Sequence, residues 1–284
     1  MSKRQRNISI IVFISLIALL IAGIFIFPAP EHHGDIQQIM QNEVLHERGK
    51  ISLFGLIDVN PGLISAFVVS AILIVFAIIV RIFVIPKFKL IPGKFQMLLE
   101  EAVGLFDNLA KNNSPHKSGF IGAYIFTAGA YIFISTIFEL LGLQAINTDG
   151  ASQTLPAPLA DINGAIAMGL LSYGVILGGG LIVNGLRGAG HALKDFSLPI
   201  SMSFRLFGAM LSGALVTELV YHYMALSFVL PVIVGVLFTL IHAVVQAYVL
   251  TMLTALFFGE CTAPHEKHEK PKKIKKPKKE KKIK

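Results

Sequence analysis

Six long apolar segments constrain the fold of this chain more than any other feature of its sequence. They cover approximately residues 8–27, 62–85, 119–143, 163–184, 196–224 and 228–258. About 20 mostly apolar residues are enough for a helix to cross the hydrocarbon core of a bilayer. Only 15% of the residues are charged, whereas soluble domains average about 25%. The sequence therefore predicts an all-α integral membrane protein with five to six transmembrane helices.

The last two segments are longer than a bilayer requires. At about 1.5 Å per residue, helices over 196–224 and 228–258 would reach about 43 and 46 Å. The hydrocarbon core is about 30 Å thick. A long, strongly tilted C-terminal hairpin is one expectation, and extension of both helices past the interface is the other.

Basic residues indicate the orientation. The N-terminus, the 86–118 loop, the 185–195 loop and the C-terminal tail carry nearly all Lys and Arg outside the apolar segments, whereas the loops on the other side hold only Arg48 and Lys50. Short loops rich in Lys and Arg remain in the cytoplasm. Six spans with both chain ends in the cytoplasm satisfy this rule.

The first segment has two interpretations, an uncleaved anchor helix or a signal peptide whose removal leaves five spans. The predicted organisation is an anchor or signal over 1–27, a non-cytoplasmic segment over 28–61, a membrane domain over 62–258, and a Lys-rich cytoplasmic tail over 259–284.

The tail accounts for the whole charge excess. Residues 265–284 contain 11 Lys and 3 Glu, which equals the net charge of +8 for the entire chain. The excess therefore does not describe a nucleic-acid-binding domain, and a tail of this composition is predicted to be disordered. Contact with anionic lipid and a solvated tail without a partner are both open.

The 86–118 loop predicts an amphipathic surface helix that ends before Pro115. Its apolar residues at helical spacing are Phe95, Leu98, Leu99, Ala102, Leu105, Phe106 and Leu109. Such a helix either lies in the membrane interface or packs beneath neighbouring helices.

Arg205 lies inside the fifth apolar segment, where an arginine costs about 2.5–3.5 kcal/mol on insertion scales. Its side chain either extends to the interface or faces a protein interior or a water path. Gly208, Ala209, Ser212 and Gly213 follow it at helical spacing, and Ser212 shares its face. Small side chains let helices approach closely, so this face is suited to a partner helix, with packing inside the chain as the alternative.

Thr239, His242 and Gln246 form a polar stripe along the last apolar segment. Histidine titrates near neutral pH, which makes the stripe a candidate ion path. Interhelical hydrogen bonding without transport is the alternative.

Four further polar residues lie near the predicted non-cytoplasmic side. Glu139 and Glu218 come late in the third and fifth segments, and Asp161 and Asn163 come at the start of the fourth. Intramembrane carboxylates relay protons in many transporters. The alternatives are interfacial exposure for the two Glu and helix capping for Asp161 and Asn163.

Four motifs resemble those of subunit a of F-type ATP synthases. They are Pro-Ile-Ser-Met-Ser-Phe-Arg-Leu-Phe-Gly at 199–208, Gln-Ala-Tyr-Val-Leu-Thr-Met-Leu-Thr at 246–254, Ile-Pro-Gly-Lys-Phe-Gln at 91–96, and Pro-Leu-Ala-Asp-Ile-Asn at 158–163. Their order and spacing agree from about residue 60 to 258. The N-terminal segment and the tail are not covered.

The resemblance implies a non-catalytic subunit without cofactors that carries protons or sodium ions past a rotating ring of hairpin subunits, each with a carboxylate. Arg205 occupies the position that separates two half-channels, Gln246 is the matching glutamine, and Gly208, Ala209 and Ser212 would contact the ring. The implied partners are the c-ring, peripheral-stalk subunit b, the other synthase subunits and membrane lipid, with no nucleic acid. The implied location is the bacterial inner membrane, with the C-terminus in the cytoplasm.

Three positions depart from the family pattern. Ala209 stands where Asn is common, Ala214 where an acidic residue or His is common, and Thr239 where His or Glu is common. We hypothesise that Glu218 and His242 serve as the polar residues of the ion path in place of these three positions.

Two other functional classes compete with this interpretation. One is a stand-alone secondary ion transporter, for which inverted repeats are expected, and none is evident in the sequence. The other is a membrane scaffold with no ion path. The sequence has neither a phosphate-binding G-x-x-x-x-G-K-[ST] loop nor Cys/His spacing typical of a metal site.

Overall fold

The computed structural model describes residues 51–53, 57–146, 152–222 and 230–263, together with Ile14, Ser15 and Ala18. Most of the first predicted segment (8–27) and most of the predicted tail (259–284), including every lysine of that tail, lie outside the described residues. The α-helices are α3 (Pro61–Ile79), α4 (Lys94–Asn113), α5 (Ser118–Phe138), α6 (Ile162–Lys194), α7 (Leu198–His222) and α8 (Leu230–Thr262). The prediction of an all-α membrane protein is confirmed.

Short elements connect the helices. A π-helical turn η1 (Val80–Val84) and a 3₁₀ turn η2 (Ile85–Lys87) extend α3, and the 3₁₀ turns η3 (Pro115–Lys117), η4 (Glu139–Leu141) and η5 (Pro158–Ala160) precede or follow α5 and α6. Two antiparallel two-stranded ribbons pair β1 (Ile51–Leu53) with β2 (Ile57–Val59) and β3 (Gln144–Ile146) with β4 (Ser152–Thr154). These ribbons lie in the connections, and Ile51 of β1 joins a small buried cluster with Val69, Phe138 and Leu155.

Four helices in the described part are long and apolar enough to cross a membrane. They are Pro61–Lys87, Pro115–Leu141, Ile162–Lys194 and Gly235–Thr262. Helix α7, which carries Arg205, is as long as a span but falls outside this group. It nevertheless packs in the same bundle, so the chain is a multi-pass membrane protein.

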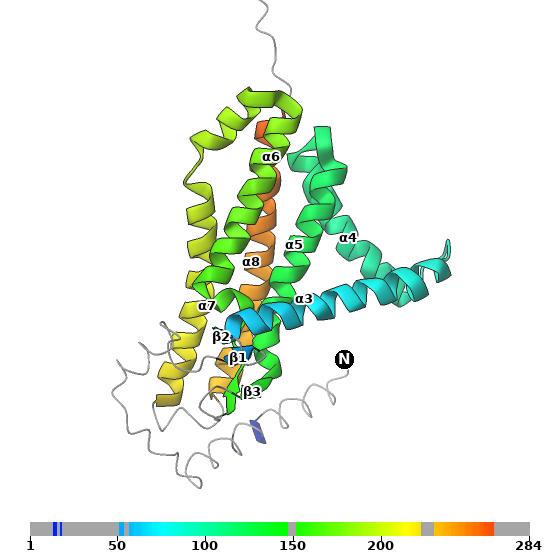
Figure 1. The fold of residues 1–284 in the computed structure, drawn as a ribbon. Helices are drawn as coiled ribbons and strands as arrows, with labels where there is room; N and C mark the ends of the chain where they lie inside the picture. Colours follow the sequence, from blue (N-terminus) through cyan, green and yellow to red (C-terminus); the bar gives the residue numbers. More distant parts are fainter. Residues whose placement is uncertain are drawn as a thin grey trace, which may run out of the picture.

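Helices α5, α6, α7 and α8 form a bundle in which α8 contacts the other three (Figure 1). Glycines bring the backbones close, as small residues do in membrane interfaces. A β-carbon at Gly179 would overlap the ring of Phe258, and one at Gly259 would overlap the carbonyl oxygen of Asn113. Substitution of these glycines would therefore force α8 away from its neighbours.

Helix α6 turns back on itself at Gly185, whose φ of 62° and ψ of −146° favour glycine. Beyond this kink, Gly188 packs against Gly180, and the Tyr173 hydroxyl donates to the Ala192 carbonyl at 3.1 Å. The sequence predicts that this helix ends at 184, which coincides with the kink. It also predicts a loop over 185–195, which is wrong, because α6 continues to Lys194 after the kink.

Helix α3 begins as the sequence predicts but packs over only part of its length. Asn60 caps it by accepting a hydrogen bond from the Gly62 N–H at 3.0 Å, and Pro61 opens its first turn. Ser65 and Val69 are buried, whereas its later residues are mostly exposed. In Figure 1 the helix lies across the direction of α5 and α8.

Helix α4 confirms the predicted amphipathic helix and its end before Pro115. Phe106, Leu109 and Ala110 pack on the core, whereas Phe95 and Leu98 remain exposed. The packing beneath neighbouring helices is thus confirmed for the end of α4 that lies against α5, and the use of its exposed apolar end stays a prediction.

Candidate functional site

Helix α7 has one side that packs in the core and one side that is exposed. Leu198, Met202, Leu206 and Met210 are buried in the core shared with α6 and α8. Arg205 lies between these positions in sequence but on the exposed side of the helix. The buried side of α7 therefore runs alongside the arginine, which lies at the edge of the exposed side.

The exposed face around Arg205 carries small side chains, and no described part of the chain covers it at Gly208. Ser201, Gly208 and Ser212 are exposed with the arginine, and no atom lies within 4 Å of a β-carbon built at Gly208. Ser212 Oγ donates to the Ala209 carbonyl at 3.0 Å, so its hydroxyl is satisfied locally. Among the described residues, Arg205 has no hydrogen bond or ion pair. The predicted sharing of one face by Arg205 and Ser212 is confirmed.

The second pair of small residues turns toward α8 instead. Ala209 is half-buried against the core, and a β-carbon at Gly213 would lie 3.9 Å from His242 Nδ1. Gly208 and Ser212 therefore remain for an external partner. Ala209 and Gly213 let α7 approach α8, which was the alternative that the sequence left open.

Gly213 and His242 lie next to each other where the antiparallel helices α7 and α8 pack together. Gln246 lies one turn from His242 along α8, and Arg205 lies two turns from Gly213 in the corresponding direction along α7. Arg205 and Gln246 therefore lie on facing stretches of one helix pair.

Gln246 is buried and keeps a free acceptor. Its side chain is 7% exposed, and its Oε1 atom has no hydrogen-bond partner in the described part of the chain. A buried polar group without a partner costs about 1–3 kcal/mol. Ala209, on the facing stretch of α7, has no side-chain group to bind it. A role of Gln246 in the function of the protein would explain why this buried acceptor has no partner.

Glu139 reaches the level of His242. Gly129 of α5 lies against Thr251 of α8, and ten residues along α5 to Glu139 correspond to ten residues back along α8 to Ile241. The 3₁₀ turn that contains Glu139 contacts α8, and the side chain is half-buried. The structure thus brings Glu139 and His242 to one level, next to the level of Gln246. The ring of His242 lies 5.7 Å from that of Phe238.

Asp161 caps α6, as one of the two sequence interpretations expects. Its Oδ1 accepts hydrogen bonds from the Asn163 N–H at 3.0 Å and from Asn163 Nδ2 at 3.3 Å. The carboxylate is 9% exposed and lies beside Gly62 at the start of α3. Asp161 therefore joins the first turns of two helices. Asn163 itself is exposed.

Glu218 lies on α7, five residues after Gly213, and its side chain is outside the described residues. Thr239 of the polar stripe is half-buried one turn before His242.

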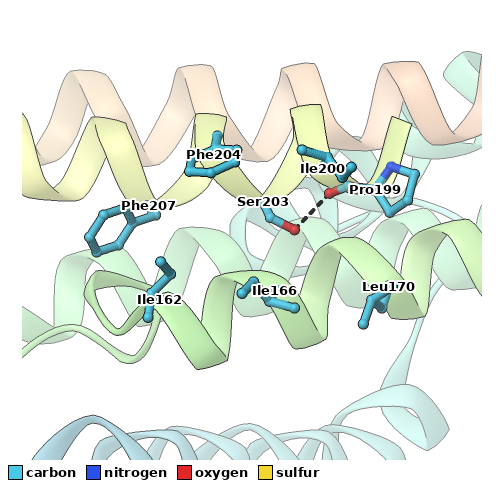
Figure 2. A pocket seen from close by; sticks show the side chains of 8 residues that line it. All are labelled: Ile162, Ile166, Leu170, Pro199, Ile200, Ser203, Phe204 and Phe207. Carbon is cyan, nitrogen blue, oxygen red and sulfur yellow. Dashed lines mark hydrogen bonds between the residues drawn. The ribbon is translucent and has the colours of Figure 1, made fainter. Parts of the chain in front are cut away.

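A cavity of about 190 Å³ opens between the first turns of α6 and α7 (Figure 2). Its lining consists of Ile162, Ile166, Leu170, Pro199, Ile200, Ser203, Phe204 and Phe207. Ser203 Oγ, the one polar side-chain group there, donates to the Pro199 carbonyl at 2.6 Å. Arg205 and Gln246 are not part of this lining, so this apolar groove does not belong to the polar levels described above.

The sequence analysis missed a polar link between α5 and α6. The hydroxyls of Tyr124 and Ser172 are 2.9 Å apart and share a hydrogen bond in a half-buried position. Each is a single hydroxyl in an apolar helix, so neither stands out by spacing. The packing of α5 and α6 around α8 brings the two together.

Comparison with known proteins identifies the family. The family described as ATP synthase A chain matches residues 63–259, which include α3 to α8 almost completely. The chain belongs to this family. The match starts close to the beginning of α3 and ends near the end of α8, in agreement with the limits of the sequence resemblance.

Several family members are similar over most of the same region. ATP synthase subunit a of Cereibacter sphaeroides is 26% identical over 180 residues, which cover 59% of this chain and 69% of the relative. Those of Actinobacillus pleuropneumoniae and Haemophilus ducreyi are 26% and 28% identical over 201 and 198 residues, each covering 59% of this chain and 76% of the relative. As an ATP synthase A chain family member, the protein acts in ATP synthesis and ion transport at a membrane.

Proposed function

We propose that this chain is the ion-translocating subunit a of an F-type ATP synthase and that it carries protons or sodium ions past a rotating ring. The observation that carries the proposal is Arg205 on the exposed face of α7, without a hydrogen bond or ion pair in the described chain. A charge on an apolar helix is stable only with a partner or water. A ring of hairpin subunits with a carboxylate supplies that partner, while nucleotide chemistry belongs to other subunits.

The arginine separates two ion paths because its guanidinium does not release its proton. It attracts a deprotonated carboxylate and favours the charged form of that group. A proton on the ring therefore has no direct route past Arg205. Movement of one charge through 100 mV is worth about 2.3 kcal/mol, and the block directs this energy into rotation.

The polar residues His242 and Gln246 of α8, together with Glu139, support one of the two ion paths. Glu139 and His242 lie at one level, Gln246 follows one turn closer to the arginine, and its free Oε1 is an acceptor for water. Glu218 extends the same path on α7. We assign Asp161 and Asn163 to the capping of α6, since their hydrogen bonds are used there.

The ring contact is the small face of α7. Gly208 and Ser212 lie beside Arg205, and Ala209 borders this face. Small side chains allow a partner helix to approach the arginine closely. Subunit b and the surrounding lipid are the proposed partners for the apolar surface that α3 and α4 leave exposed.

The distribution of basic residues supports a cytoplasmic C-terminus in a bacterial plasma membrane. Arg187 after the kink of α6 and Lys117 before α5 lie at the same end of the bundle as the end of α8. Basic residues near helix ends mark the cytoplasmic side. The strand ribbons lie toward the other end.

Replacement of Arg205 tests the proposal. Arg205→Ala in the complete synthase is expected to assemble but to lose ATP-driven ion pumping in inverted membrane vesicles. Arg81→Ala is the matched control, since Arg81 is also an exposed arginine in an apolar helical segment. Retained pumping in Arg205→Ala, or equal loss in both variants, contradicts the proposal.

The proposed roles of His242 and Glu218 in the ion path have their own test. Passive proton flux through the membrane sector is expected to fall at least about tenfold in His242→Ala and Glu218→Ala, the low end of what a positioned proton-transfer group contributes. Thr239→Ala, one turn from His242, is the control and should retain its flux. Near-normal flux in both variants would remove His242 and Glu218 from the path.

A further inference from the structure

The α3–α4 loop, residues 87–94, exposes two large aliphatic side chains at its tip. Leu90 is fully exposed and Ile91 is 87% exposed, the two highest values among the large apolar side chains of the described part. The turn η2 packs mainly on η1, and α4 makes its main contacts with α5 and α8 rather than with α3. In Figure 1 the loop points away from the bundle. No described part of the chain therefore covers these two side chains.

A side chain of α4 gives this loop a defined shape. The Lys89 N–H donates to Gln96 Oε1 at 3.1 Å, and Gln96 Nε2 donates to the Lys89 carbonyl at 3.0 Å. Gln96 Nε2 also donates to Glu100 Oε1 at 2.7 Å, one turn further along α4. The pair of bonds closes the loop between Lys89 and Gln96. The exposure of Leu90 and Ile91 therefore belongs to a fixed loop conformation.

Positive charge surrounds the aliphatic tip. Lys87, Lys89 and Lys94, the three loop lysines, are all exposed. No acidic residue occurs between positions 59 and 99. The cores of protein interfaces are depleted in lysine, whereas segments that lie in a membrane interface combine lysine with large apolar side chains. Charge complementarity therefore favours an anionic lipid surface over a protein partner for this loop.

We propose that the α3–α4 loop binds anionic phospholipid. Leu90 and Ile91 enter the apolar boundary of the leaflet, and the three loop lysines contact the phosphates and anionic headgroups around them. Lysines near an anionic leaflet are attracted to it, and the attraction decays within a Debye length. The proposal rests on the proposed function, which includes lipid among the partners of α3 and α4, and it names the loop and the headgroup class.

This contact would supply a support that the bundle does not give to α3. Only the first turns of α3 pack closely, at Ser65 and Val69, and the residues after them are mostly exposed. A loop bound to headgroups would hold the far end of α3 and the start of α4 at a fixed depth in the leaflet.

Photo-crosslinking in the complete synthase tests the proposal. The crosslinking amino acid p-benzoylphenylalanine replaces Leu90, and the complex is reconstituted in vesicles of equal parts phosphatidylglycerol and phosphatidylcholine. The ratio of phosphatidylglycerol to phosphatidylcholine among the lipid adducts, measured by mass spectrometry, is expected to exceed the bulk ratio at least about threefold. The same probe in place of Ile74, which is 59% exposed on α3 away from the lysines, should give the bulk ratio.

Three variants separate charge from loop shape. Replacement of the three loop lysines by Gln should return the ratio at position 90 to the bulk value. Replacement of Lys111, Lys117 and Lys194 by Gln removes as many exposed lysines elsewhere and should leave the enrichment unchanged. Gln96→Ala keeps every lysine but loses both bonds to Lys89, and it should lower the enrichment. At about 1 M salt, where the Debye length is about 3 Å, the enrichment should disappear.

ATP-driven pumping is measured in the same vesicles and is expected to persist in all of these variants. A loss of enrichment with normal pumping therefore concerns the loop alone, and a failure of the proposed function is recognised separately by the Arg205 variant. Lipid adducts at the bulk ratio, or an enrichment that survives replacement of the three loop lysines, overturn the proposal. Adducts with another synthase subunit in place of lipid also overturn it and indicate a protein partner. Enrichment that depends on the three loop lysines supports it.

Discussion

Helices α3 and α5 are two apolar spans of equal length with opposite packing. With their terminal turns both cover 27 residues, and the most apolar stretch of α3 has a mean hydropathy of 3.1 against 1.7 for α5. Yet 11% of that stretch is buried in α3 and 44% in α5. The more apolar helix is therefore the less buried one, the reverse of the rule for water-soluble cores.

The difference lies in small and polar residues rather than in hydropathy. Lipid tails are as apolar as leucine, so membrane helices associate through close backbone approach and hydrogen bonds. Helix α5 buries Gly122, Gly129, Ser135 and Thr136, and its Tyr124 binds Ser172. Beyond Val69, α3 carries almost only large aliphatic and aromatic side chains, which suit lipid or another subunit equally well.

The strongest test of this difference replaces glycines. Gly259→Ala is expected to destabilise the purified chain by about 3 kcal/mol, at the upper end of overpacking costs, because the added carbon meets the backbone of Asn113. Gly208→Ala should change stability by less than about 0.5 kcal/mol, since nothing lies near it. Unfolding in mixed micelles, followed by the loss of helical circular dichroism, measures both.

Equal effects of the two alanines would mean that close backbone approach does not hold α8 in the bundle. The interpretation of α7 would then change as well, because the free space at Gly208 is part of the proposed ring contact.

A pair of isoleucines tests the burial difference directly. Ile125 of α5 is fully buried, whereas Ile74 of α3 is 59% exposed. Ile125→Ala should cost about 2 kcal/mol, since it leaves a cavity among packed helices. Ile74→Ala should be nearly neutral in micelles, because detergent fills the space. A large loss for Ile74→Ala in the isolated chain would show that α3 packs more closely than the structure indicates.

The smallest expected effect concerns the junction of the two regions. Asp161 caps α6 and lies against the first turn of α3. Asp161→Ala should cost about 1 kcal/mol through loss of the cap, whereas Asp161→Asn retains the acceptor and should cost a few tenths. The same unfolding measurement compares them. If Asn is as damaging as Ala, the carboxylate charge itself is needed, and the assignment of Asp161 to capping is wrong.

Much of the architecture was predictable from local patterns. The bounds of α5, α7 and α8 agree with the apolar segments to within a few residues, because charges, prolines and glycines mark their ends. The return of α6 after Gly185 was not predictable, since Arg187, His191 and Lys194 break the apolar pattern there and favour a loop. The partial packing of α3 depends on neighbours and has no local signal.

The candidate site was predictable in part. Spacing alone linked Arg205 to Ser212, and the burial of α7 confirms that they share a face. Spacing did not separate Gly208 from Ala209, because both are small and adjacent, and only the position of α8 distinguishes them. The levels that bring Glu139 to His242 come from the register of α5 and α8, which no single segment encodes.

The central position of α8 has a consequence for biosynthesis. Helices α6 and α7 pack on each other directly, whereas α5 meets them mainly through α8, which is synthesised after all three. The final turn of α8 is also the one that Asn184 holds. Helix α5 must therefore wait in the membrane beside α6 and α7, without its main contact to them, until α8 has been made. Truncation of even the last turns would leave an open bundle, a ready substrate for membrane quality-control proteases.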